Sequence, residues 1–331
     1  MKTRVFILTL LAMIAFASNS LLCRAALRDT GIDAASFTFI RILSGAIALY
    51  LIAIARTSFS SPVTRHSSLA SGNWPSAFAL FAYAAAFSFA YNTLAAGTGA
   101  LLLFGAVQAT MIIWGFHKGE RFDALQIIGF AVAIAGLIVL VFPGLSAPPL
   151  IGSILMLAAG LAWGVYSVRG KSARDATAAT TGNFLRAVPF AALISVIAIP
   201  QTHLNSLGIT YAVISGAITS GLGYVIWYMV LPQIKATSAA VVQLSAPVLV
   251  ATGGILLLRE PITVRYVIAS IAILGGIFLV IMERRSTSAA YELRNKDQQN
   301  KNREQHQVDA ALQNVRLPAP ERDHARGQSQ D

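Results

Sequence analysis

Charged residues are scarce in most of this 331-residue chain, and the scarcity is uneven. Residues 1–283 contain 16 Lys or Arg and 7 Asp or Glu, about 8% of that segment, whereas residues 284–331 contain 9 and 7. A soluble globular domain carries about 25% charged residues. The first segment therefore has too little polar surface to cover itself in water. The composition excludes a soluble protein and indicates a membrane protein with a polar tail.

Cysteine and buried acidic residues are also lacking. Cys23 is the single cysteine, which excludes an intrachain disulfide, and no Cys/His cluster has metal-ligand spacing, so we expect no metal and no cofactor. No Asp, Glu or His falls in the middle of a predicted helix. A membrane-embedded enzyme needs a nucleophile, a metal cluster or an acid–base pair at depth, so we predict that the protein is not an enzyme. The same absence predicts weak or no proton coupling.

Long apolar runs are what the sequence does contain. Three of them hold no Lys, Arg, Asp or Glu, namely 66–117, 124–168 and 187–234. Each has room for two spans of about 20 residues, separated by turn signals such as Gly97-Thr98-Gly99. The runs are continuous rather than alternating, which excludes a β-barrel. We predict an all-α integral membrane protein with ten transmembrane helices, at 5–25, 35–55, 75–95, 99–117, 124–142, 150–169, 181–200, 208–231, 236–258 and 264–282.

The first of these helices has an alternative interpretation as a secretory signal peptide, because Lys2 and Arg4 precede an apolar run. The internal repeat favours a structural helix instead. Phe39-Ile40-Arg41 matches Phe184-Leu185-Arg186, and Glu120 matches Glu260. Each half has an odd number of helices, so the two halves are predicted to be inverted, as in many transporters with a site near the membrane midplane. The predicted division is a first repeat 1–142, a second repeat 143–283 and a polar tail 284–331, which its composition predicts to be disordered.

Basic residues near the helix ends predict the orientation. Ten helices put both termini on one side of the membrane. Ten basic residues gather there, against four on the other side (Arg24, Arg28, Arg259 and Arg265). We therefore predict cytoplasmic termini and a cytoplasmic tail. This bias accounts for most of the net charge of +11, so no nucleic acid partner is expected; the expected partners are a small-molecule substrate and the lipid bilayer.

The sequence resembles the ten-helix EamA-domain family of the drug/metabolite transporter superfamily. The resemblance rests on Arg41 and Arg186, on Glu120 and Glu260, and on motifs such as Ala162-Trp163-Gly164 and Ser245-Ala246-Pro247. The first half departs from the family pattern at Ser18-Asn19 and Val107-Gln108. The resemblance implies export or exchange of small, amino-acid-like metabolites across a bacterial inner membrane. The alternatives are an exchanger of nucleotide-sugar-like or other anionic metabolites and a non-transporting membrane sensor.

Two sets of candidate functional residues follow. Polar side chains within hydrocarbon face the bundle interior or a wet cavity, and aromatic residues accompany them at helical spacing, as in Tyr83, Phe87 and Tyr91. The predicted substrate cavity comprises Asn19, Tyr91, Asn92, Gln108, Trp163, Tyr166, Tyr224, Trp227 and Gln243. The predicted gating charges are Arg41 with Glu260 at the outer end and Arg186 with Glu120 at the inner end. The alternatives are interhelical packing for the cavity set, and headgroup contact or helix capping for the charges.

Overall fold

The computed structural model describes residues 2–57, 71–117, 124–142, 144, 147–170, 175–230, 233 and 242–279, and three positions of the tail (298, 299 and 307). The chain divides into two units, residues 1–283 and 284–331, and the elements below belong to the first. Within the described ranges the regular structure is helical, without a strand. Apart from those three positions, the tail that the composition predicts to be disordered lies outside the described residues.

The described helices follow one another along the chain. In chain order they are α1 (Lys2–Asp29), α2 (Ala34–Thr57), α4 (Trp74–Tyr91), α5 (Ala96–His117), α6 (Ala124–Val141), α7 (Leu150–Gly170), α8 (Ala176–Ile197), the short 3-10 helix η1 (Ile199–Gln201), α9 (Ser206–Val213), the π-helix η2 (Ile214–Leu222), α10 (Gly223–Val230) and α12 (Ser245–Leu258). A further apolar helix spans Val264–Leu279.

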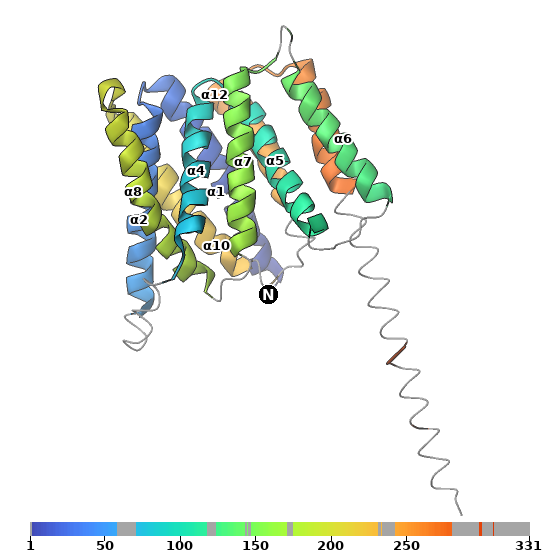
Figure 1. Cartoon of the computed structure of the whole chain (residues 1–331), viewed down its shortest axis with the longest axis horizontal. Coiled ribbons are helices and arrows are strands. Elements are labelled where there is room, and N and C mark those ends of the chain that lie inside the picture. Colours follow the sequence, from blue (N-terminus) through green and yellow to red (C-terminus); the bar gives the residue numbers. More distant parts are fainter. Residues whose placement is uncertain are drawn as a thin grey trace, which may run out of the picture. The chain divides into compact units, whose positions relative to one another are not determined.

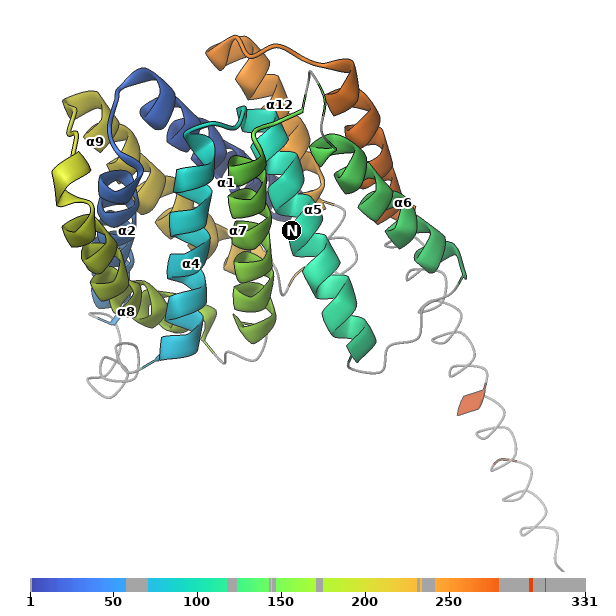
Figure 2. The same cartoon turned by 45° about the horizontal axis from the view of Figure 1, so that its top comes forward.

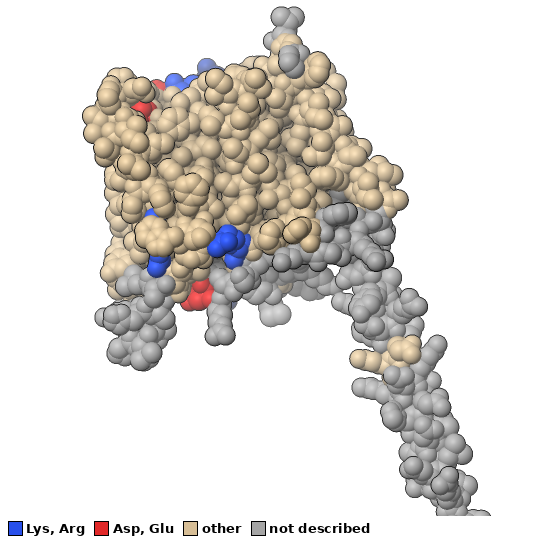
Figure 3. Space-filling view, viewed as in Figure 1, with Lys and Arg blue, Asp and Glu red and all other residues tan. Residues whose placement is uncertain are grey.

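The described helices are suited to a bilayer. Seven are long and apolar enough to cross a membrane: α1, α2, α5, α6, α7, α8 and the continuous rod of α9, η2 and α10. Large apolar side chains stand on the outside, with Ile151 and Val264 both 76% exposed. On the face seen in Figure 3, described charged side chains lie near the helix ends and leave a broad uncharged band between them. The chain is therefore an integral, multi-pass membrane protein.

Several helix ends differ by a few residues from those that the sequence predicts, and two differences bear on the site. α4 ends at Tyr91, and the turn falls before the predicted Gly97-Thr98-Gly99, which lies inside α5. Gly99 is needed there for packing rather than for a turn, because a Cβ atom on it would collide with the Tyr91 ring. In the eighth predicted helix, hydrogen bonding changes to the wider π pattern over Ile214–Leu222, which apolar periodicity does not reveal.

Helices that are far apart in the chain pack on one another. α2 contacts α8, α4 contacts α7, α5 contacts α12, and α1 contacts the rod of α9, η2 and α10. α4 and α7 lie side by side in the middle of both views, with α2 and α8 to one side and α5 and α6 to the other (Figures 1 and 2). α6 meets the helix Val264–Leu279 through Gly136 and Gly276, whose missing Cβ atoms allow close approach. As a result of these contacts, α1, α2, α4 and η2 are surrounded by other helices in their middle parts.

Candidate substrate site and gate

Arg41 is the centre of the candidate site. It lies in α2, is 2% exposed, and is among the largest fully buried side chains of the described chain. Its Nη2 atom donates to the Tyr83 hydroxyl at 3.1 Å and lies 3.5 Å from the Ser220 hydroxyl. The guanidinium carbon is 5.3 Å from the Tyr83 ring centroid and 4.9 Å from that of Phe87, within cation–π range. The side chain thus joins α2 to the middle of α4 and of η2.

A polar network beside Arg41 links α1 to the π-helix. The Asn19 amide donates to the Tyr83 hydroxyl at 3.3 Å, and its carbonyl oxygen accepts from Ser215 at 2.7 Å. The Thr219 hydroxyl lies 3.3 Å from the same oxygen. All four side chains are at most 6% exposed. The π-helix allows this, because Ser215, Thr219 and Ser220 all lie within it, and π segments occur often at functional sites.

Aromatic rings form a wall next to these polar groups. The Trp163 ring of α7 lies 4.8 Å from that of Tyr83, 5.1 Å from that of Tyr224 and 5.5 Å from that of Tyr166, centroid to centroid. Trp163 keeps part of its surface accessible, whereas Tyr83, Tyr166 and Tyr224 are buried. Within the described chain the Trp163 indole N–H has no acceptor. The wall therefore offers a flat π surface and an available donor.

The structure brings together four of the nine predicted cavity residues: Asn19, Trp163, Tyr166 and Tyr224. Asn92 is different, because α4 ends before it: it is exposed at the helix C-terminus, and its carbonyl accepts from Arg24. Tyr91 is fully buried and donates to the Ala96 carbonyl, which is a packing role.

The other predicted cavity residues lie elsewhere. Trp227 belongs to a separate cluster with Ala12 and Met13 of α1. Gln108 is 5% exposed in α5, and Gln243 is half-buried just before α12. The structure places neither amide in the network around Asn19. The correction for Asn92 follows from a helix end, which apolar periodicity fixes to within a few residues.

Sequence reasoning misses three hydroxyl residues of the site: Ser215, Thr219 and Ser220. Serine and threonine are ordinary residues in a membrane helix, so their only signal is their crowding with glycines over Ser215–Gly223. It also pairs Arg41 with Glu260, a contact that the structure does not contain among its described residues. The charge looks terminal because Arg41 is only eight residues into α2, but its long side chain reaches the middle of its neighbours.

A second charged cluster closes one end of the helices. Glu260 follows α12, and its Oε1 atom lies 3.0 Å from Nε of Arg24 in α1, with both side chains nearly buried. Its Oε2 atom accepts from the backbone N–H of Ala96, the first residue of α5, at 2.7 Å. Arg24 also donates to the Tyr91 carbonyl at the end of α4. Anionic groups are favoured at helix N-termini and cations at C-termini, so Glu260 suits the N-terminus of α5 and Arg24 suits the C-terminus of α4.

The backbone holds Glu260 in this position. Arg259 caps α12 in the left-handed region, with φ of 53° and ψ of 35°, and the Glu260 N–H donates back to the Gly254 carbonyl at 3.0 Å. Arg28 of α1 donates to the Leu258 carbonyl at 2.8 Å. A non-glycine residue with positive φ is uncommon and marks a constrained turn. We call Arg24, Arg28 and Glu260 the latch.

The latch replaces one of the predicted gate pairs. Glu260 pairs with Arg24, whereas Arg41 has no ion pair among the described residues. The predicted pair of Arg41 and Glu260 is therefore not formed, because the guanidinium of Arg41 turns toward Tyr83 in the interior. Arg186 donates to the carbonyls of Ser71 and Gly182. Its predicted partner, Glu120, lies outside the described residues.

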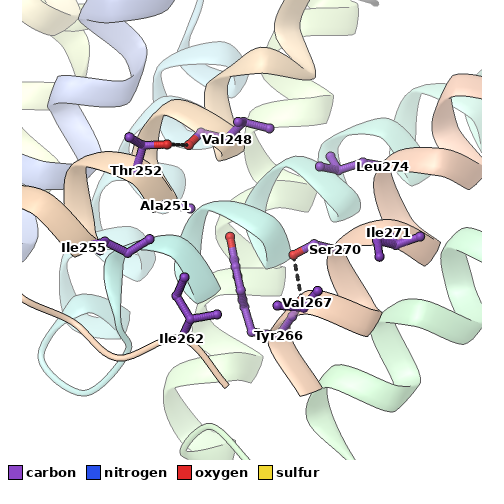
Figure 4. Close-up of a pocket in the computed structure, with 10 residues that line it drawn as sticks. All are labelled: Val248, Ala251, Thr252, Ile255, Ile262, Tyr266, Val267, Ser270, Ile271 and Leu274. Carbon is purple, nitrogen blue, oxygen red and sulfur yellow. Dashed lines mark hydrogen bonds between the residues drawn. The ribbon is translucent and has the colours of Figure 1, made fainter. Parts of the chain in front are cut away.

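A groove on the outside is separate from this site. It has a volume of about 230 Å³ and lies between α12 and the helix Val264–Leu279. Figure 4 shows a largely aliphatic lining, with the Tyr266 ring in the middle. Thr252 and Ser270 donate to carbonyls of their own helices. Several lining residues are among the exposed apolar ones, such as Ile271 at 70%, so the groove faces the lipid side.

Comparison with known proteins places the chain among transporters. The model of the EamA-like transporter family matches residues 150–282. An uncharacterized protein of Pseudomonas aeruginosa is 51% identical over 86% of this chain and 97% of its own length. A probable amino-acid metabolite efflux pump of Escherichia coli is 28% identical over 56% of this chain and 67% of its own. A protein of known crystal structure shares the fold, with a TM-score of 0.58 and 18% identity over 85% of this chain and 98% of its own. The chain belongs to the EamA-like transporter family, within the drug/metabolite transporter superfamily.

Proposed function

We propose that the protein exports or exchanges small, amino-acid-like metabolites by alternating access and has no enzymatic activity. The observation that carries this proposal is the polar site of Asn19, Arg41 and Ser215, which is buried among membrane-length helices beside an aromatic wall. Polar groups at such depth are costly and are typical of transport pathways. The similarity to a probable amino-acid metabolite efflux pump of Escherichia coli supports the class of cargo.

Helix packing supports the inverted repeat on which alternating access depends. If 1–142 and 143–283 are the repeats, then α2 packs on its counterpart α8, and α5 on its counterpart α12. α1, the first helix of the first repeat, contacts the rod of α9, η2 and α10, which is the third element of the second repeat. In the same way α4, the third element of the first repeat, contacts α7, the first helix of the second. A two-fold axis in the membrane plane would produce this set of contacts, and it would place the substrate site near the midplane.

The same repeat suggests where the second gate lies. Arg24 and Glu260 form the latch at one end. In the sequence, Arg169 is the counterpart of Arg24 at an offset of 145, and Glu120 is the counterpart of Glu260 at an offset of 140. We therefore propose that Arg169 and Glu120 pair at the opposite end when the latch opens. This pair replaces the one between Arg186 and Glu120.

The orientation follows from the distribution of basic residues. The end that holds Arg24, Arg28, Arg259 and Arg265 has fewer of them, so we place it outside the cytoplasm. Both termini are then cytoplasmic and the latch closes the outer end. The relatives from Pseudomonas aeruginosa and Escherichia coli support the bacterial inner membrane as the location.

Flux from liposomes tests the proposed function. Purified protein is reconstituted into liposomes that contain a mixture of amino acids and related carboxylates, and the efflux of each compound is measured. We expect selective loss of a few compounds relative to protein-free liposomes. Binding of a compound without any flux would instead support the alternative of a membrane sensor. Flux without selectivity would contradict a specific carrier.

A further inference from the structure

Arg41 combines deep burial with an unsatisfied hydrogen-bond donor. Its Nη1 atom is buried and has no partner, the one such side-chain N or O atom among the described residues. The hydrogen bonds of Nη2 and the contacts with the Tyr83 and Phe87 rings satisfy only part of the guanidinium. A buried guanidinium without a carboxylate is costly, because desolvation of the charge is not repaid. A ligand that supplies an anionic oxygen would remove that cost.

The protein offers no carboxylate of its own at this place. The described acidic residues of the membrane unit all lie at helix ends: Asp29, Asp33, Asp175 and Glu260. Glu260 pairs with Arg24 in the latch, and Asp33 accepts from the backbone N–H groups of Ser36 and His203. The charge of Arg41 is therefore matched by hydroxyl and aromatic groups alone within the described chain.

Tyr83 adds a second donor beside Arg41. Its oxygen accepts from Arg41 and from Asn19, and no described acceptor takes its own proton. The proton therefore remains available to an anion that approaches Nη1. The Trp163 ring lies 4.8 Å from the Tyr83 ring, centroid to centroid, and supplies a flat surface. Two donors and a π wall suit a carboxylate attached to a flat, apolar body.

We propose that Arg41 binds the carboxylate of the transported molecule and that the wall of Tyr83, Trp163 and Tyr224 holds its apolar body. The proposal rests on the proposed transport function and narrows its cargo to carboxylates. A cationic amine without a carboxylate is excluded, because it would meet an uncompensated guanidinium. Since Nη1 is sealed in this structure, the anion must enter as the helices around Arg41 separate, which is the motion that alternating access requires.

Arg186 provides a matched control. It is the repeat counterpart of Arg41, in α8, but its Nη1 atom donates to the carbonyls of Ser71 and Gly182 at 2.8 and 3.0 Å. The two arginines thus occupy equivalent places in the sequence with different surroundings. Arg41→Met removes a charge that lacks an anionic partner among the described residues, whereas Arg186→Met breaks the hydrogen bonds to Ser71 and Gly182. We expect the first to lower ligand affinity without lowering thermal stability and the second to do the reverse.

Binding to the full chain in lipid nanodiscs tests the proposal. The probes are 3-phenylpropanoate, phenylalanine and 2-phenylethylamine, which share a ring and differ in their charged groups, and the readouts are tryptophan fluorescence and thermal shift. We expect both carboxylates to bind and the amine not to bind. Arg41→Met should weaken carboxylate binding roughly 10- to 100-fold at an unchanged or raised melting temperature. Arg186→Met should leave affinity within about twofold.

The opposite results overturn the proposal. Binding of the amine as tightly as the carboxylates would do so, as would no binding of either carboxylate, or a change below about threefold in Arg41→Met. These outcomes are distinct from failure of the proposed function. Carboxylate binding that depends on Arg41, without liposome flux of any compound, would support the carboxylate site at Arg41 and contradict the transport function. Flux that is unaffected by Arg41→Met would support the transport function and contradict the carboxylate site at Arg41.

Discussion

Arg24 and Glu260 are 236 positions apart in the chain, yet their side chains meet at 3.0 Å and join the first helix to the turn after α12. The carboxylate also accepts from the N-terminus of α5, and Arg24 also reaches the end of α4. One ion pair and two hydrogen bonds to the backbone thus join four helix ends. All three contacts must break before these ends can separate.

The latch should contribute strongly to stability. Glu260→Gln leaves Arg24 nearly buried without its anion, and breaking such a pair costs about 3–5 kcal/mol. We expect a clear fall in the melting temperature in detergent. Asp29→Asn is the control: its pair with Arg28 is 45% exposed on the Asp29 side and should contribute less than about 1 kcal/mol. Equal effects of the two substitutions would show that the latch is not structural.

The two proposed gates should exclude each other. In a Cys23→Ser background, one cysteine pair replaces Arg24 and Glu260, and another replaces Glu120 and Arg169. A bifunctional thiol reagent that spans about the combined length of the two native side chains should link the first pair in the state described here, because an ion pair of Arg24 and Glu260 bridges these positions. Linking the first pair should then suppress linking of the second, as measured by mass spectrometry in a variant that contains both. Simultaneous linking of both pairs in one molecule would contradict alternating gates.

The crossing of α2 and η2 should not tolerate a methyl group. A Cβ atom at Gly216 would collide with the Arg41 carbonyl oxygen and the Ser44 hydroxyl. We expect Gly216→Ala to cost about 1–3 kcal/mol and to impair carboxylate binding, because it displaces Arg41. Gly275→Ala is the matched control, since a Cβ atom there has nothing within 4 Å. Thermal unfolding and ligand titration of both variants give the comparison, and a neutral Gly216→Ala would argue against this packing.

Transport should be independent of a pH gradient. The described acidic residues of the membrane unit lie at helix ends, so none of them is placed at depth to carry a proton with the cargo. We expect equal flux with and without a gradient when an ionophore clamps the membrane potential. The measurement is initial efflux rate from liposomes at matched internal pH. A rate that collapses when the gradient is removed would identify proton coupling.

The sequence alone determined the membrane character, the helical class and the approximate helix positions, because each depends on apolar length and charge spacing along the chain. It also singled out Asn19, Trp163, Tyr166 and Tyr224, since polar and aromatic residues at depth are rare enough to notice. Apolar length does not fix helix ends, however: the sequence predicts Asn92 in the cavity, but this residue lies beyond the last turn of α4.

Only the tertiary structure decided which charges meet. Arg24, Arg41 and Glu260 are all compatible with an ion pair near the same end of the membrane, and helix positions do not rank the pairings. A long arginine side chain can reach several neighbours, so its partner depends on helix crossing and on the direction in which the side chain leaves the backbone. The same holds for the π-helix, which aligns Ser215, Thr219 and Ser220 with Asn19 and Arg41 through backbone geometry that apolar patterning does not encode.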